Sequence, residues 1–397
     1  AVFGKIQEHH DALRLTYKMN PKDGDIVQTG QGLDYPLSLV EYDLRNRKNG
    51  PAELNTRVNE IQASIDLEMG PLMKLGLFHL DDGDRLLIVI HHLVIDGVSW
   101  RILFEDIETL YSQHRQGKSF ALPAKTDSFK LWSQQLVPYA NSNILLEEKG
   151  YWAQLESNII HGMPGIPKDF ETAENNVGDT RSLSFKLGKK ETGRLLTRVN
   201  QAFGTEINDI LLTALGLGMK KTFGQDRVLL ALEGHGREDI IEDIDISRTV
   251  GWFTSVYPVV LNISYPEQPG RQIKEIKESL RGIPNRGIGY GILKYLAREE
   301  NKKEIEFKLK PQIIFNYLGQ FDEDVKQLST LEPAKESTGN SQSLNNLREY
   351  LFDINGMISQ DRLIVTFTYN NNHFKAETVA ALIENCRAEL SGIIDFC

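Results

Sequence analysis

The sequence predicts an α/β protein built as two lobes, and three observations support this prediction. Apolar runs with the length of strands alternate with segments of helical periodicity along most of the 397 residues. Two of these runs, Leu86–Ile90 and Arg227–Leu232, are continuous enough for strands buried on both faces, and each ends in a polar turn. His161–Asp179 is rich in glycine and proline and lacks sustained periodicity, as is typical of a linker. We therefore expect a first lobe at residues 1–160, a linker at 161–180 and a second lobe at 181–397.

The elements of the first lobe follow from periodicity and from turn residues. Pro51 fits the first turn of a helix, a glycine turn separates the first two strands, and DDGD at residues 81–84 is a hairpin turn. Strands are expected at Ile26–Thr29, Leu37–Leu44, Leu72–Leu80 and Leu86–Ile90. Helices are expected at Val2–Leu15, from Pro51 to Ile61, from Val98 to Leu110, and around Phe129–Leu136 and Leu145–Leu155.

The second lobe repeats this layout, since a buried strand again runs into a polar turn. Strands are expected at Ser182–Leu187, Arg227–Leu232, Val256–Ile263 and Gln312–Leu318, with a hairpin at Tyr350–Tyr369 that turns at SQDR. Helices are expected at Glu191–Phe203, Ile207–Lys221, Ile273–Leu280, Gly291–Ala297 and Ala376–Ile393. Thr205 is expected to cap the helix that begins at Ile207.

Composition excludes several classes of protein. A net charge of -10 argues against a nucleic-acid binder, which would carry a basic patch. Two cysteines make no disulfide framework, and no apolar run has the length of a membrane span. We expect a cytoplasmic monomer that binds neither nucleic acid nor membrane.

The stretch Arg85–Leu110 carries the side chains of the first lobe that are best suited to chemistry. Its apolar strand ends in His91 and His92, and Asp96 and Gly97 form a turn before an amphipathic helix. An imidazole at a strand end is oriented yet open to substrate, and imidazole can accept a proton near neutral pH. The same pattern also fits structural histidines bonded to carbonyl groups. Asp96 is expected to hold the loop, through a salt bridge or backbone N–H groups, so that His92 is correctly aimed.

Metal binding is the less favoured interpretation of these histidines. Alternation along a strand sends His91 and His92 to opposite faces, where they are poorly placed to share an ion. A second pair, His9 and His10, precedes Asp11 within a predicted helix and has no turn after it. We interpret this second group as structural and expect no metal site.

Four motifs in order resemble the epimerization domains of nonribosomal peptide synthetases, which belong to the condensation superfamily. They are HHLVIDGVSW from His91, EGHGRE from Glu233, TVGWFTSVYPV from Thr249 and FNYLGQF from Phe315. The resemblance spans essentially the whole chain. It implies two lobes like those of chloramphenicol acetyltransferase, each a mixed sheet flanked by helices, with the active site in the cleft between them. The PIQ-type opening motif of the family is not found, so we expect the first lobe to lack its first strand and helix.

The resemblance also assigns roles in the second lobe. Glu233 ends a buried strand beside glycines, and partial burial would raise its pKa and let it donate a proton at neutral pH. Taken alone, it could equally be a surface carboxylate in a glycine turn. Tyr317, which follows Asn316, is a second candidate donor, although tyrosines at strand ends are usually packing residues. Trp252 is expected to line the site together with Phe253.

The activity that the resemblance implies is epimerization at Cα of an L-aminoacyl or peptidyl thioester. The substrate would be held on the 4'-phosphopantetheine of a peptidyl carrier domain, and the chain would need no cofactor of its own. His92 and Glu233 would act on opposite faces of Cα through an enolate, giving an L/D mixture. An adjacent adenylation domain and a downstream condensation domain are the other expected partners. The alternatives are a condensation domain, which forms a peptide bond between two carrier-bound substrates, and an inactive carrier-docking domain.

Overall fold

The computed structural model describes residues 1–160, 162–171, 174–320 and 331–397, and the chain divides into two compact units. Unit 1 comprises Ala1–Ser133, Asp243–Phe253 and the described part of Glu323–Gln342. Unit 2 comprises Gln134–Glu242, the described part of Thr254–Asp322, and Ser343–Cys397. Each unit thus draws on separate segments, whereas the predicted lobes divide the sequence once. The boundaries at 160 and 181 remain a prediction.

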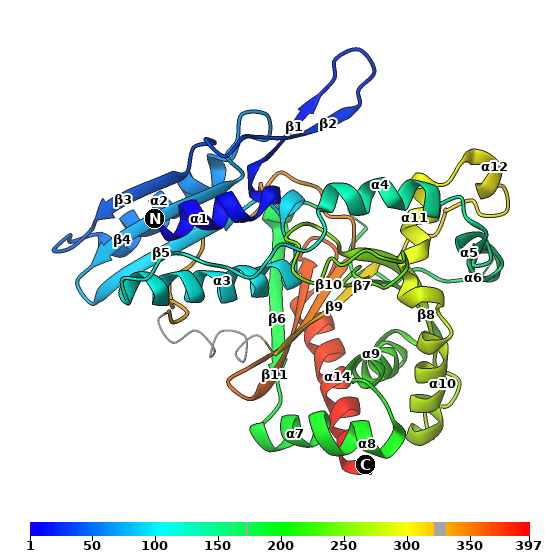
Figure 1. The fold of residues 1–397 in the computed structure, drawn as a ribbon. Helices are drawn as coiled ribbons and strands as arrows, with labels where there is room; N and C mark the ends of the chain where they lie inside the picture. The colour runs from blue at the N-terminus through cyan, green and yellow to red at the C-terminus, as the bar shows by residue number, and fades with distance from the viewer. Residues whose placement is uncertain (161, 172–173, 321–330) are drawn as a thin grey trace. The chain divides into compact units, whose positions relative to one another are not determined.

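Unit 1 is built on a mixed three-stranded sheet of β3 (Ser38–Asp43), β4 (Met73–Leu80) and β5 (Gly83–Ile90) (Figure 1). Strand β3 runs parallel to β4, and β4 runs antiparallel to β5. Helix α2 (Gly50–Ala63) covers one face, where Val58 and Ile61 pack against Phe78 and Val89. Helices α1 (Val2–His9) and α3 (Gly97–Arg115) contribute to the cluster on the other face. The predicted strand at Leu86–Ile90 is confirmed as β5, but it lies at the edge of the sheet. Leu87 and Val89 are buried, whereas Ile88 and Ile90 on the other face are only half-buried, so burial on both faces is not borne out.

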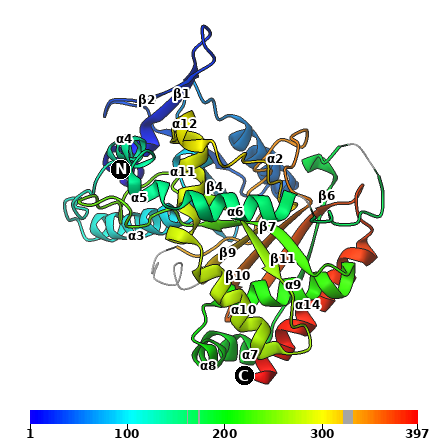
Figure 2. The same cartoon turned by 90° about the vertical axis from the view of Figure 1, so that its right-hand side faces the viewer.

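The helix predicted at Val2–Leu15 is wrong in its second half. Helix α1 ends at His9, a 3-10 turn follows at Asp11–Arg14, and Leu15–Met19 forms strand β1. Strand β1 pairs antiparallel with β2 (Ile26–Gly30), and this hairpin extends away from the rest of unit 1 (Figures 1 and 2). The helical spacing of the apolar residues misled the prediction, because strand pairing with β2 decided the conformation.

Unit 2 contains a mixed six-stranded sheet in the order β6-β11-β10-β9-β7-β8. Neighbouring strands are antiparallel except for the pairs β10–β9 and β9–β7, which are parallel. The strands are β6 (Thr180–Lys186), β7 (Arg227–Gly234), β8 (Ser255–Asn262), β9 (Ile313–Gln320), β10 (Phe352–Ser359) and β11 (Arg362–Asn370). Every strand predicted for the second lobe is confirmed, including the hairpin turn at Ser359–Arg362.

In unit 2, the helices α9 (Ile207–Phe223) and α14 (Ala376–Phe396) lie against each other (Figure 2). The remaining helices are α5 (Asn143–Leu146), α6 (Lys149–Ile160), α7 (Lys189–Arg194), α8 (Asn200–Phe203), α10 (Pro269–Arg281), α11 (Ile288–Leu296) and α12 (Glu299–Lys302), while α4 (Phe129–Tyr139) crosses the boundary of the units. A π-helical turn at Leu195–Val199 joins α7 to α8. Thr205 does not cap α9, because the N-cap residue is Glu206, whose N–H donates to Asp209 Oδ2 at 2.8 Å.

Alternation along the strands gives the six-stranded sheet two different faces. Phe315, Ile354 and Phe367 are buried on one face. Residues one position along each strand, including Asn316 and Asp353, point to the other face and are only half-buried. The sheet therefore presents a polar face as well as a core face.

The predicted linker is bound to unit 2 where the structure describes it. The N–H of Ile166 donates to Gln312 Oε1 at 2.7 Å, and Gln225 Nε2 donates to the carbonyl of Gly165 at 3.1 Å. None of the helices in the described part of the chain is long and apolar enough to cross a membrane.

The close contact between Gly218 of α9 and Cys386 of α14 allows a test of the packing in unit 2. A Cβ added at Gly218 would overlap Cys386 Sγ and lie 3.0 Å from the Cα and N of Cys386. Helix backbones cannot yield easily, so Gly218→Ala should destabilise the fold by about 1–3 kcal/mol. Gly392→Ala is the matched control in α14, because nothing lies within 4 Å of its added Cβ. That change should stabilise the fold by up to about 1 kcal/mol, and urea unfolding curves would measure both variants. Equal effects of the two substitutions would contradict this packing.

Candidate active site

In unit 1, the two adjacent histidines directly follow β5 and have different surroundings. His91 is half-buried; its N–H donates to the Leu72 carbonyl at 2.9 Å, and its Nδ1 accepts from the Leu93 N–H at 3.2 Å. Burial, with the neighbouring His92, lowers the pKa of His91. His92 is exposed instead. His91 thus has a structural position, and His92 is the imidazole open to a substrate.

Asp96 makes the backbone contacts that the sequence led us to expect. It is 2% exposed and caps α3, since its Oδ1 accepts from the Ser99 N–H at 2.7 Å. Its Oδ2 accepts from the Phe253 N–H at 3.0 Å. Gly97 is the first residue of α3 rather than the second residue of a free turn. The Asp96 carboxyl group therefore joins α3 to Phe253, which lies 157 residues farther along the chain.

The segment Asp243–Phe253 belongs to unit 1 and is bound to α3 at several points. Ser99 Oγ donates to the Gly251 carbonyl at 2.9 Å and accepts from the Gly251 N–H at 3.1 Å. Farther along α3, Arg248 pairs with Asp106 at 2.6 Å, and Val250 joins the buried cluster between α1 and α3. We call Asp243–Phe253 the clamped segment.

Trp252 lies in the clamped segment and contacts His92. The two ring centroids are 5.2 Å apart with an interplanar angle of 64°, an edge-to-face arrangement. Trp252 is 44% exposed, whereas Phe253 is buried and packs against Phe129 and Trp132. The structure therefore brings His92 and Trp252 together at the surface of unit 1, and the role of Trp252 in lining the site remains a prediction. Phe253, which was expected to line the site as well, lies in the core instead.

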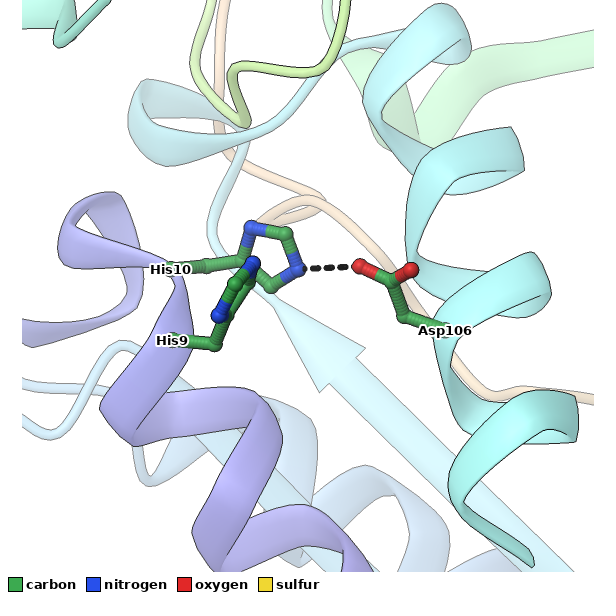
Figure 3. A group of neighbouring side chains, drawn as sticks. All are labelled: His9, His10 and Asp106. Carbon is green, nitrogen blue, oxygen red and sulfur yellow. Dashed lines mark hydrogen bonds and ion pairs between the residues drawn. The ribbon is translucent and has the colours of Figure 1, made fainter. Parts of the chain in front are cut away.

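In the second histidine pair, the buried His10 contacts Asp106 rather than the neighbouring Asp11. His10 Nε2 lies 2.8 Å from Asp106 Oδ2, and His9 packs edge-on against His10 (Figure 3). Asp11 instead pairs with Arg14 and with Lys125. These contacts support the structural interpretation.

His9, His10 and Asp106 also have ligand atoms within 4.8 Å of one another, which is close enough for a metal ion. However, Asp106 Oδ1 already accepts from Arg248 at 2.6 Å, and Oδ2 pairs with His10. A cation at this position would meet the charge of Arg248 and displace a buried ion pair. The residues present fit an ion pair better than a metal.

In unit 2, Glu233 lies near the end of β7 on the polar face of the sheet. Its Oε2 accepts a hydrogen bond from Asn316 Nδ2 on β9. Burial raises the pKa of Glu233, and the Asp353 carboxylate raises it further. A protonated carboxyl group can both accept from Asn316 and donate its own proton to a substrate. The predicted direction of the pKa shift is confirmed.

Asp353 and Arg348 were missed by the sequence analysis. Arg348 Nη2 donates to Asp353 Oδ2 at 2.8 Å and to the Thr368 carbonyl at 2.9 Å, and its side chain is 5% exposed. The pair keeps a charged carboxylate on the same sheet face as Glu233. The alternation of Asp353 and Asn355 with apolar residues in the predicted hairpin would have placed them on one face, but nothing in the sequence aligned that face with Glu233.

Tyr317 is not beside Glu233 in unit 2. It follows Asn316 along β9, so alternation turns it to the opposite face of the sheet. A Cβ added at Gly356 would lie 3.3 Å from Tyr317 Cδ2 and 3.6 Å from Leu211 Cδ1, which places the ring next to α9. Phe321, the last residue of the FNYLGQF motif, lies outside the described residues.

The two glycines that follow Glu233 are favoured at their positions for different reasons. Gly236 has a φ of +67°, a conformation that strongly favours glycine. A Cβ at Gly234 would lie 2.9 Å from Ser255 Oγ on the neighbouring strand. Beyond them, His235 pairs with Glu238 at 3.2 Å. The turn after β7 therefore depends on glycine for its backbone, as the sequence indicated.

Each unit thus presents a group suited to proton transfer: an exposed imidazole in unit 1 and a half-buried carboxyl group with a raised pKa in unit 2. The predicted meeting of His92 and Glu233 over one substrate carbon remains a prediction.

Comparison with known families and proteins places the whole chain in one group. The sequence model described as "Condensation domain" matches residues 1–397. Gramicidin S synthase 1 from Brevibacillus brevis is 47% identical over 406 residues, and tyrocidine synthase 2 from Brevibacillus parabrevis is 46% identical over 397 residues. Both matches cover 100% of this chain but only 36% and 11% of those proteins. The chain therefore spans about a third or less of these relatives.

The solved structures differ widely in their similarity to the chain. The epimerization domain from the third module of tyrocidine synthetase B is 45% identical with a TM-score of 0.95, covering 100% of this chain and 88% of that one. The first condensation domain of the CDA synthetase is 16% identical with a TM-score of 0.66, covering 99% and 86%. The second likeness reflects the fold alone. Together they confirm the predicted fold class, in which mixed sheets are flanked by helices.

The raised pKa of Glu233 predicts a dependence of stability on pH. The folded state holds this proton more tightly than the unfolded chain, whose glutamates titrate near 4.5. The stabilising contribution is full below that value and is lost as pH rises through the folded pKa. The loss amounts to about 1.4 kcal/mol for each unit by which the pKa is raised. As pH rises from about 4.5, Glu233→Gln should therefore lose less stability than the wild type, as measured by urea unfolding.

Asp353→Asn is the control for the cause of that shift. Removing the nearby negative charge should bring the pKa of Glu233 closer to its ordinary value and make the pH dependence shallower. An identical pH dependence in the wild type and Glu233→Gln would show that Glu233 titrates normally.

Proposed function

The chain belongs to the Condensation domain family, and we propose that within it the chain is an epimerization domain of a nonribosomal peptide synthetase. Its reaction would invert Cα of an L-aminoacyl or peptidyl thioester and yield a mixture of L and D epimers. The observation that carries this proposal is Glu233, a half-buried carboxyl group whose pKa is raised by burial and which accepts a hydrogen bond from Asn316. Peptide-bond formation has no evident need for such an acid, whereas stereoinversion requires a proton donor.

The comparisons support the same choice. The likeness to an epimerization domain extends over the whole chain at high identity, whereas the likeness to a condensation domain reflects the fold alone. The relatives are synthetases of gramicidin, tyrocidine, surfactin and bacitracin. A role inside a multidomain synthetase is therefore the natural context for this chain.

In the proposed reaction, the thioester carbonyl acidifies the Cα–H bond. His92 removes that proton, and the electron pair of the C–H bond moves into an enolate. Glu233 then delivers its proton to the opposite face of Cα. This step re-forms the thioester carbonyl and leaves Cα with inverted configuration. The enzyme returns to its starting state when the His92 imidazolium loses a proton and the Glu233 carboxylate gains one. Tyr317 is the second candidate for the donor.

The substrate would arrive on the 4'-phosphopantetheine arm of a peptidyl carrier domain. That group is a prosthetic group of the carrier, and thioester activation of Cα–H supplies what an added cofactor would otherwise supply. We propose the adenylation domain that loads the carrier and a downstream condensation domain as further partners. The proposed location is the cytoplasm.

Exchange of the Cα proton tests this function. The intact module, with its carrier loaded with L-aminoacyl or peptidyl substrate, should incorporate deuterium at Cα in D2O and form the D epimer. His92→Ala should lower the rate of D-epimer formation by about 10²–10⁴-fold, the usual contribution of a general base. Glu233→Gln should lower it by a similar factor, and mass spectrometry with chiral chromatography would measure both.

His114→Ala is the matched control, because His114 lies in the last turn of α3 and packs near Phe120. It should leave the rate unchanged. Formation of an amide product without exchange at Cα would identify a condensation domain instead. Unchanged epimer ratios in both His92→Ala and Glu233→Gln would mean that the chain only docks carriers.

A further inference from the structure

The orientation of His92 raises a question that the proposed function leaves open. A catalytic imidazole usually has a partner that fixes its ring. Among the described residues, no side chain donates a hydrogen bond to the His92 ring or accepts one from it. Asp96, the residue expected to aim it, directs its oxygens to the N–H groups of Ser99 and Phe253 instead.

Trp252 is the aromatic group that contacts the His92 ring, edge to face at 5.2 Å. Such contacts contribute roughly 0.5–1.5 kcal/mol beyond the burial of surface. That energy is enough to favour one orientation of an exposed imidazole over others, provided that Trp252 itself is held in place.

The backbone on both sides of Trp252 is held by buried side chains of the first turn of α3. Ser99 is fully buried, and its hydroxyl donates to the Gly251 carbonyl and accepts from the Gly251 N–H. Asp96 accepts from the N–H of Phe253. Both neighbours of Trp252 in the chain are therefore fixed to the helix that begins five residues after His92.

Packing restricts the same residues. A Cβ added at Gly251 would lie 2.7 Å from Phe129 Cδ2 and 3.0 Å from Phe253 Cε2. Phe253 itself is buried against Phe129 and Trp132. Gly251 and Phe253 are thus buried, whereas Trp252 between them is exposed. The clamped segment leaves the Trp252 ring beside His92.

We propose that Trp252 is the positioning residue that orients the His92 imidazole, and that Ser99 acts through Trp252 by fixing the clamped segment. Asp96 serves the same purpose from the other side of Trp252, so it aims His92 indirectly. This inference rests on the proposed function of His92 as a base, but it concerns contacts within unit 1 alone.

Trp252→Leu and Trp252→Phe test the role of the ring in the intact module. The leucine variant should lower kcat for D-epimer formation by about 10–100-fold, the scale of effect that a misplaced catalytic group produces. Its KM should stay within about twofold of the wild type, because a positioning residue acts on the reacting imidazole rather than on substrate binding. Trp252→Phe keeps an aromatic ring and should recover most of the lost kcat.

Ser99→Ala tests the clamp through a spectroscopic readout. In protein labelled with 13C-histidine, the ring current of Trp252 shifts the His92 ring protons, and Trp252→Leu assigns that shift. Ser99→Ala should reduce the shift and lower kcat in the same direction as Trp252→Leu. The control is Thr109→Ala, since the Thr109 hydroxyl on α3 donates to the Glu105 carbonyl within the helix. It should change neither quantity.

The outcomes separate this inference from the proposed function. If His92→Ala abolishes epimerization while Trp252→Leu retains the wild-type kcat, the orienting role is wrong and the function stands. An unchanged His92 shift in folded Ser99→Ala would remove Ser99 from the account. If His92→Ala retains full activity, the function itself fails, and the chemical shifts still report whether Trp252 and Ser99 hold the ring.

Discussion

The arrangement of unit 1 depends on one buried carboxyl group. Asp96 accepts from the first turn of α3 and from the Phe253 N–H, so one side chain joins a helix N-terminus to a distant segment. A helix N-terminus leaves backbone N–H groups without intrahelical partners and favours negative charge, which suits a carboxyl group at this position. Because the His92 loop leads directly into α3, this contact also fixes the surroundings of the imidazole. Asp96 and Gly97 of the motif therefore have a structural role next to His92, the proposed base.

Unit 2 uses a different principle, the contrast between the two faces of a sheet. One face is packed with apolar side chains and helices, and the other carries Glu233, Asn316 and Asp353. Arg348 pairs with the Asp353 carboxylate. The negative charge of Asp353 disfavours ionisation of Glu233. A carboxyl group that stays protonated at higher pH is a proton donor, which is the role that stereoinversion requires.

Most of the strands could be predicted from sequence, because each is a short apolar run bounded by turn residues. The helix expected at Val2–Leu15 could not be delimited, since strand β1 forms only by pairing with β2. Long-range pairings of this kind leave little trace in local periodicity. The same limit explains why Asp106 was not foreseen as the partner of His10, 96 residues away.

The candidate site shows a similar division. Motifs identified His92 and Glu233 as titratable groups, and burial of Glu233 followed from its position after an apolar strand. Ser99 lies within the HHLVIDGVSW motif, but its contact with Gly251 forms only because the clamped segment belongs to unit 1. Tyr317 shows the same limit: a motif named it as a second candidate donor, but the motif could not show that alternation along β9 places it on the sheet face opposite Glu233. The sequence identifies residues with suitable chemistry, whereas the direction in which each side chain points is known only from the fold.

The claim at the centre of this account is that two different groups serve the two faces of Cα. The isotope at Cα of the D epimer, formed in the first turnover in D2O from a loaded L substrate with ordinary hydrogen, tests this most directly. Two groups predict that essentially every D epimer carries solvent deuterium, because the proton removed by one group cannot return through the other. D epimer that retains the substrate hydrogen would show that a single group works on both faces and would contradict the account.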